Sequence, residues 1–238
     1  MKKKSFKTWT IKILLIPISL FYILFLYLDI FNREIFISSD SIKYLTMILI
    51  FIISLFIGQD SLDKKDRYLL QLGLFLTLIA DLFLLLLGRH YILGIFLFII
   101  VQIIYAHRYS REDLRHIIRN RIILFTSLYI PYLLINRFLI GLDLLYFAGL
   151  FYGISILLST IDAYRAYKYK RFPSPNRQMI LIGMILFILC DINVGLYNLL
   201  GEISRESVVY NISFLSMWLF YLPSQVLLVL SGYDCENY

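Results

Sequence analysis

Long apolar runs separated by short polar segments make up almost the whole chain. The runs are continuous rather than alternating, so they predict helices and exclude a β-barrel, whose strands alternate lipid-facing and lumen-facing residues. Each run is close to the length of about 20 residues that a helix needs to cross the hydrocarbon core. The predicted spans are Ile13–Ile30, Ile42–Ile57, Tyr68–Gly88, Tyr91–His107, Arg121–Asn136, Phe138–Thr160, Gln178–Leu200 and Asn211–Ser231.

These runs predict an all-α protein, a polytopic membrane helix bundle of about eight transmembrane helices. No shift in composition marks a domain boundary, so residues 1–238 are expected to form a single integral membrane domain. The first run has no small-residue cleavage site after it, and we interpret it as an uncleaved span. Very short links, Arg89–His90 and Arg137, should join the third span to the fourth and the fifth to the sixth as antiparallel neighbours.

The composition agrees with a membrane protein. Hydrophobic residues make up 60% and charged residues 16% of the chain, whereas soluble domains contain about 25% charged residues. The two cysteines, Cys190 within a span and Cys235 in the tail, suggest no disulfide framework.

The basic residues set the predicted orientation. With the N-terminus in the cytoplasm, the inner segments hold 18 lysines and arginines and the outer segments hold 5. Because cytoplasmic loops carry an excess of basic residues, both ends are expected inside (N-in/C-in), in a bacterial-type cytoplasmic membrane. This topology explains the net charge of +7 without a nucleic-acid partner.

A few strongly polar side chains lie deep in the predicted spans. They are Asp81, Gln102, Asp191, Asn193 and Gln225. Ionisable residues inside a membrane are expensive to bury and usually face a bundle interior or a wet cavity. Asp81 and Asp191 are therefore the first candidates for a functional site, whereas Asp29, at the end of the first span, is expected to be solvated.

The depth of the two aspartates makes them a pair. Asp81 follows Tyr68 by thirteen residues and Asp191 follows Gln178 by thirteen, and both spans run in the same direction. At 1.5 Å per residue, both carboxylates reach about 20 Å into the membrane. Two carboxylates at one level in a low-dielectric site do not both ionise readily, so we expect a neutral acid beside a carboxylate.

On three of the predicted spans, polar, aromatic or small residues recur at steps of three and four and so lie on one helical face. The stripes are Tyr91, Gly94, Phe98, Gln102 and Tyr105; Trp218, Tyr221 and Gln225; and Asp191, Gly195 and Asn198. Together they could line a pocket. Simpler roles remain for several members: interhelical hydrogen bonds for the two glutamines, and packing or interface anchoring for Tyr91, Tyr105 and Trp218. The Gly149–Gly153 step in the sixth span is interpreted as helix packing only.

Three stretches resemble motifs of the YhhN-like lysoplasmalogenase family: ADLFLLLLGRHYILGIFLFIIVQIIYAHRY, GMILFILCDI and FYLPSQVLLVLS. The matching positions are Ala80, Asp81, Gly94, Phe98, Gln102 and Tyr105 in the first, Gly183, Phe187, Cys190 and Asp191 in the second, and Tyr221 and Gln225 in the third. The resemblance covers most of the chain from Tyr68 onward. Three positions depart from it: Ala80 replaces a glycine, Gln102 a histidine and Cys190 a serine.

The resemblance implies an eight-span enzyme that cleaves the vinyl ether of lysoplasmalogens, which are lysophospholipid-like membrane lipids. Such cleavage begins with protonation of carbon and forms an oxocarbenium ion, to which water adds. It needs a neutral acid and a carboxylate that stabilises the cation and activates water, as at glycosidic bonds. Asp81 and Asp191 fit these two roles in either order.

Six further residues are candidates for the substrate site. Tyr105, Tyr221, Gln102 and Gln225 would position the water and the ether oxygen, while Asn198 and Trp218 would line the pocket. Glutamine at position 102 can orient a water or an oxygen but cannot act as an acid or a base.

Other functions compete with this hypothesis. A zinc hydrolase is not favoured, because His90, His107 and His116 lie away from the aspartates; we expect no metal and no cofactor. A serine hydrolase lacks a deep histidine. A proton-coupled transporter would use a deep aspartate pair equally well, although no inverted repeat is visible. A non-catalytic membrane lipid-binding protein is the remaining alternative.

Overall fold

The computed structural model describes residues 2–31, 33, 36–57, 61–139, 141–205 and 207–234, with side chains from Trp9 onward. This part of the chain is helical and contains no β-strand. The helices are α1 (Lys2–Phe31), α2 (Ser39–Ile57), α3 (Lys64–Asp81), the π-helix η2 (Leu82–Leu86), α4 (Tyr91–Ser110), α5 (Leu114–Phe138), α6 (Leu144–Lys168), α7 (Asn176–Ile203) and α8 (Val208–Leu230).

Eight helical segments among the described residues are long and apolar enough to cross a membrane, α3 and η2 together making one of them. The predicted fold class, an all-α polytopic membrane bundle, is therefore confirmed. The side of the membrane on which the two ends lie stays a prediction.

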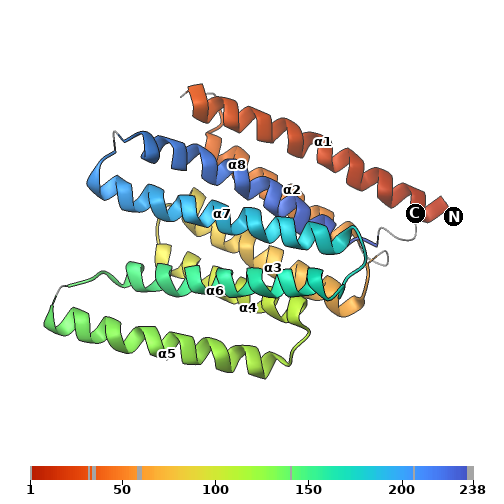
Figure 1. The fold of residues 1–238 in the computed structure, drawn as a ribbon. Helices are drawn as coiled ribbons and strands as arrows, with labels where there is room; N and C mark the ends of the chain where they lie inside the picture. Colours follow the sequence, from red (N-terminus) through yellow and green to blue (C-terminus); the bar gives the residue numbers. More distant parts are fainter. Residues whose placement is uncertain are drawn as a thin grey trace.

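The helices form an elongated bundle with α1 along one edge and α5 along the other (Figure 1). These two edge helices are the least buried, whereas α2, α4 and α8 are buried along about half of their length. The closest packing joins α7 to α8, where Ser224 donates a 2.8 Å hydrogen bond to the Gly183 carbonyl. A Cβ on Gly183 would lie 3.0 Å from Leu228, so the glycine permits this approach.

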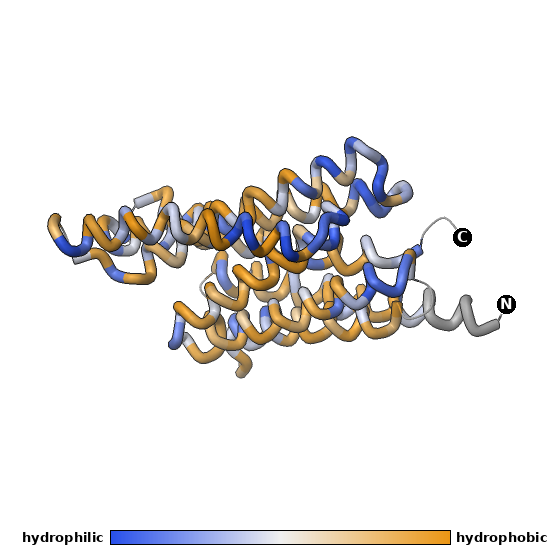
Figure 2. Tube along the Cα trace, turned by 90° about the horizontal axis from the view of Figure 1, so that it is seen from below, coloured by the Kyte–Doolittle hydropathy of each residue, from blue (hydrophilic) through white to orange (hydrophobic). Residues whose placement is uncertain are grey.

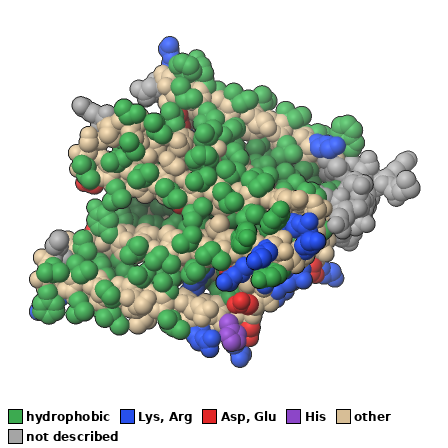
Figure 3. Space-filling model, in the orientation of Figure 1, with side chains coloured by type: hydrophobic (Ala, Val, Ile, Leu, Met, Phe, Trp, Pro, Cys, Tyr) green, Lys and Arg blue, Asp and Glu red, His purple; other side chains and the backbone are tan. Residues whose placement is uncertain are grey.

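The two ends of the bundle differ in charge. We call "basic end" the end where α3, α5 and α7 begin and where α4, α6 and α8 finish. Hydrophilic segments are most extensive there (Figure 2), and lysine and arginine side chains gather at the same end in Figure 3. The other end, where α4, α6 and α8 begin, we call the opposite end.

Two predicted span limits are wrong at the fifth and sixth helices. The fifth was expected from Arg121, but α5 begins at Leu114, where Asp113 caps it by accepting a hydrogen bond from the Arg115 amide. The one-residue link at Arg137 is also wrong, because α5 continues through Phe138 and α6 begins only at Leu144. Hydropathy marks the lipid-spanning part of a helix, whereas capping side chains set where the helix begins.

A buried ion pair locks the basic end. Arg108 on α4 donates to both carboxylate oxygens of Asp66 on α3, at 2.7 and 3.0 Å, and also to Ser231 at 3.1 Å. Bidentate pairs of this kind fix geometry as well as charge. The same contacts hold α3, α4 and the end of α8 together.

Candidate active site

Asp81 and Asp191 each accept a short hydrogen bond from a tyrosine on another helix. Tyr221 on α8 donates to Asp81 at 2.7 Å, and Tyr152 on α6 donates to Asp191 at 2.6 Å. Asp81 is the last residue of α3, and the π-helix η2 begins directly after it. Wide helical turns of this kind are frequent at functional sites.

Aromatic rings fill the space between the two acid–tyrosine pairs. Phe187 lies edge-on to Tyr221 with ring centroids 5.9 Å apart, and edge-on to Phe98 at 6.0 Å. Phe98 in turn contacts Tyr152 at 5.8 Å. The rings therefore form one apolar wall that links the Asp81 side of the site to the Asp191 side.

Among the residues that the structure describes, no cation pairs with either carboxyl group, that of Asp81 or that of Asp191. The two groups are close enough for their charges to interact, and the Cys190 thiol lies near both. A buried charge normally requires a partner of opposite sign, so this arrangement favours a pair that shares protons over a pair that serves as a structural anchor.

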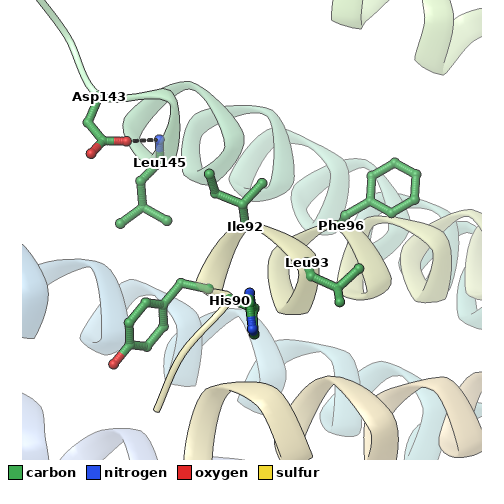
Figure 4. Close-up of a pocket in the computed structure, with 7 residues that line it drawn as sticks. His90, Ile92, Leu93, Phe96, Asp143 and Leu145 are labelled. Carbon is green, nitrogen blue, oxygen red and sulfur yellow. Dashed lines mark hydrogen bonds between the residues drawn. The ribbon is translucent and has the colours of Figure 1, made fainter. Parts of the chain in front are cut away.

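A cavity of about 570 Å³ opens at the opposite end, between the first turns of α4 and α6. Its lining residues are His90, Tyr91, Ile92, Leu93, Phe96, Asp143 and Leu145. Figure 4 shows Leu145 and Ile92 facing each other across this space, with His90 on its other side. The lining is mostly apolar, as is usual for the binding sites of small hydrophobic molecules.

One face of α6 runs from this cavity toward the acid pair. Leu145, Gly149 and Tyr152 follow at steps of four and three residues, which places them on the same side of the helix. A Cβ added to Gly149 would meet no atom within 4 Å, so the space beside this residue is open. Figure 3 shows the surface hollowed between α7 and α6 in the half of the bundle away from the termini.

The expected packing role of Gly149 and Gly153 is wrong. A Cβ on either glycine would reach open space, and Gly153 is exposed. The spacing of small residues indicates where helices can approach closely, but a neighbour is also required. Here α7 diverges from α6 instead, and Gly195 on α7 likewise faces open space.

The sequence pattern of the YhhN family matches residues 39–232. The chain belongs to the YhhN family. The matched range begins with α2 and includes every candidate site residue named above, whereas α1 lies outside it. No curated protein and no solved structure gives a significant match to the chain.

Within this YhhN-family bundle, three of the predicted substrate-site residues lie toward the basic end from the aspartates. Gln102, Tyr105 and Gln225 are all 0% exposed. Their polar side-chain atoms have no hydrogen-bond partner among the described residues. The Gln102 amide does lie next to Tyr152.

Two other predicted residues are not in contact with the carboxyl groups. Trp218 contacts Tyr221 edge-on at 5.7 Å, but its face carries the Lys43 ammonium, 4.4 Å from the ring centroid. Asn198 is exposed and donates to the Val194 carbonyl of its own helix. The predicted stripe through Asn198 therefore borders the open space beside α7 and is not part of the enclosed site.

Sequence reasoning missed Tyr152, the partner of Asp191. A signal was present, because Tyr152, Ser155 and Ser159 follow at steps of three and four on α6. Abundant tyrosines concealed it: the chain has 19 of them, most in predicted spans, where a lone tyrosine is usually an interface anchor.

The expectation that Asp29 is solvated is wrong. Its side chain is 6% exposed and pairs at 3.0 Å with Lys43, which is 2% exposed. Lys43 also pairs with Asp40 at 3.0 Å. A lysine counted as an outer loop charge thus lies inside the bundle, because two carboxylates and the Trp218 ring replace its water.

No set of three histidine, cysteine, aspartate or glutamate side chains converges as a metal site would require, within the described ranges. The described side chains at the site are two carboxyl groups, their tyrosines and the neighbouring amides.

Proposed function

We propose that this YhhN-family protein hydrolyses the vinyl ether bond of lysoplasmalogens inside the membrane. The observation that carries the proposal is a buried carboxyl group, Asp81, and a half-buried one, Asp191, each held by a tyrosine and neither paired with a cation among the described residues. A pair of this kind can divide into one proton donor and one carboxylate. Those are the two groups that the reaction needs.

The reaction is balanced by one water molecule. The carboxylic acid of the pair delivers its proton to the carbon of the double bond that does not carry oxygen. The other carbon becomes an oxocarbenium ion, which the carboxylate stabilises. Water then adds to this carbon and loses a proton to a carboxylate, and the hemiacetal breaks into an aldehyde and a glycerol hydroxyl group.

The surroundings of the pair suit the cationic intermediate. The rings of Phe98 and Phe187 lie between the two acid–tyrosine pairs. An aromatic face attracts a cation by about 0.5–2 kcal/mol, more where water is excluded. Tyr152 and Tyr221 fix the two carboxyl groups, so that little reorganisation is needed as charge develops.

The open side of the site gives a lipid a way in. The cavity between α4 and α6 ends at Leu145, and the open space beside Gly149 on α6 and Gly195 on α7 would extend it to Tyr152. A lipid with a single chain could lie along this path with its vinyl ether at the carboxyl groups.

The path can be blocked without damaging the helix. Gly195→Trp should fill the space beside α7 and lower turnover, since the side chain would enter an open region. Leu196→Trp is the matched control, because Leu196 is exposed on another side of the same helix. Equal turnover by the two variants would contradict access between α6 and α7.

The activity is tested with purified protein and three lysophospholipids that carry a vinyl ether, a saturated ether or an ester. Only the vinyl ether should release fatty aldehyde, because the saturated ether has no double bond to protonate. In D₂O the aldehyde, trapped at once as a stable derivative, should carry one deuterium on the carbon next to the carbonyl. Aldehyde without this deuterium would exclude carbon protonation, and no aldehyde at all would refute the hydrolase.

Proton-coupled transport is the second candidate, favoured by buried polar groups that continue from the acid pair toward the basic end. Proteoliposomes distinguish the two functions. Flux of a lipid or an ion that follows a pH gradient, with no aldehyde formed, would favour transport. Aldehyde formation independent of any gradient favours the hydrolase.

A further inference from the structure

Unpartnered polar atoms cluster on the basic-end side of the acid pair. They belong to side chains that are 0% exposed and come from four helices: Thr77, Gln102, Tyr105, Ser155 and Gln225. The hydroxyl groups and both atoms of each amide, seven atoms in all, have no hydrogen-bond partner among the described residues.

Helical register places three of these residues in one layer. Thr77 precedes Asp81 by four residues, Gln225 follows Tyr221 by four, and Ser155 follows Tyr152 by three. Because α3 starts at the basic end while α6 and α8 finish there, all three steps lead in the same direction. Each step is about 4.5–6 Å along the axis and stays on the same helical face.

The layer continues along α4 toward the basic end. Gln102 lies next to Tyr152, and Tyr105 and Tyr109 follow on the same face of α4 with ring centroids 5.8 Å apart. The Tyr105 ring occupies the space beside Gly73, where no Cβ would fit. The Tyr109 hydroxyl is also unpartnered among the described residues, and the neighbouring Arg108 leads to the ion pair at the basic end.

Such a concentration of orphaned groups requires a ligand. A buried donor or acceptor without a partner destabilises a protein by about 1–3 kcal/mol, and native structures satisfy roughly 90% or more of them. The groups here are neutral and both donate and accept. They point to small neutral molecules that can do the same, and water is the molecule with that property.

We propose that Thr77, Gln102, Tyr105, Ser155 and Gln225 line a column of bound water that joins the acid pair to the basic end. Each water would make about three hydrogen bonds to these side chains and to its neighbours. If the proposed hydrolysis is correct, this column supplies the water and exchanges the protons, while the lipid arrives from the opposite end. The column itself does not depend on that activity.

Cysteine reactivity tests the proposal, because a thiol reacts through its thiolate, which forms only where water is present. In a Cys190→Ser/Cys235→Ser background, Ser155→Cys reports on the column. Ser224→Cys is the matched control: Ser224 is also a 0% exposed serine in mid-span, but it is bonded to the Gly183 carbonyl. Thr77→Cys serves as a second reporter from α3 if Ser155→Cys does not fold.

The variants are reconstituted in nanodiscs and treated with a small water-soluble methanethiosulfonate, with labelling followed by mass spectrometry. We expect the column cysteine to react at least tenfold faster than the control cysteine. Equal and slow reaction of both would show a dry interior, with the orphaned groups bonded to one another, and would overturn the proposal.

The unmodified protein provides an independent measurement. X-ray radiolysis of bound water labels adjacent side chains, so Tyr105 should be hydroxylated, whereas the equally buried Met184, which lies in the apolar core, should be protected. Labelling of Met184 without Tyr105 would contradict the column. Neither measurement uses turnover, so a failure of the hydrolase assay leaves their outcome unaffected.

Discussion

Two buried carboxylate sites on the same helix, α3, have opposite surroundings. At the basic end, both oxygens of Asp66 are bound by the Arg108 guanidinium. Four helical turns further along, Asp81 accepts a hydrogen bond from the Tyr221 hydroxyl and lies near Asp191, with no cation beside it among the described residues. Both side chains are less than 10% exposed, so burial alone does not distinguish them.

The two sites differ in the protonation states that their hydrogen-bond partners allow. An arginine that donates two hydrogen bonds holds the carboxylate charged and fixed, which suits a structural connection. A tyrosine hydroxyl can accept a hydrogen bond as well as donate one, so it can stay bonded to a carboxyl group in either of its protonation states. A site that exchanges protons therefore requires the second kind of partner.

The largest expected effect is on catalysis at the central pair. Asp81→Asn and Asp191→Asn should each lower aldehyde release by about a thousandfold, within the range of general acid–base catalysis. Asparagine keeps an oxygen that accepts the tyrosine hydrogen bond, so thermal unfolding in detergent should change little. Turnover near that of the unmodified protein in both variants would remove these residues from the mechanism.

The same substitution at Asp66 should affect stability instead. Asp66→Asn leaves the Arg108 charge buried without a counterion, which destabilises a protein by about 3–5 kcal/mol. Equilibrium unfolding in mixed micelles measures the loss. The double variant Asp66→Leu/Arg108→Met removes both charges and should recover most of it; an equally unstable double variant would mean that packing, not charge, is responsible.

Removing one tyrosine hydroxyl should have an intermediate effect. A hydrogen bond to a charged group contributes about 1.5–3 kcal/mol, so Tyr221→Phe and Tyr152→Phe should each reduce turnover by about tenfold to a hundredfold. Tyr197→Phe, near the opposite end and stacked on Tyr210, is the control. Turnover equally low in the control would point to general disturbance of the bundle.

Gly73 lies on α3 between the two carboxylate sites and contacts the Tyr105 ring. Gly73→Ala forces this ring to move, and overpacking of this kind destabilises by about 1–3 kcal/mol. Thermal unfolding measures the change. A second substitution, Tyr105→Leu, should relieve it, and a double variant no more stable than Gly73→Ala would show that the ring is not the cause.

The smallest effect is expected at Cys190, where the family motif has a serine. The thiol lies near both central carboxyl groups but forms no ion pair or metal site with them among the described residues. Cys190→Ser should change turnover by less than about threefold in the aldehyde assay. A larger loss would give the thiol a direct part in the reaction.

The sequence by itself determined the class of fold and the depth of the key residues. Continuous apolar runs can satisfy their backbone in lipid only as helices, so the number of spans followed from local composition. The equal spacing of Asp81 and Asp191 from the starts of parallel spans placed them at one level, since helical rise is constant. The motifs around Asp81 and Asp191 resembled motifs of the YhhN family, to which the chain belongs.

The tertiary structure alone decided which side chains meet. Tyr152 and Lys43 acquired their roles from neighbours distant in sequence: Tyr152 from Asp191, and Lys43 from Asp29 and the Trp218 ring. It also separated Asn198 from the enclosed site, because α7 diverges from α6 at its far end. The helical period of the sequence determines the face of the helix on which a residue lies. Which side chains meet also depends on the rotation and separation of the two helices, and these depend on packing along their whole length.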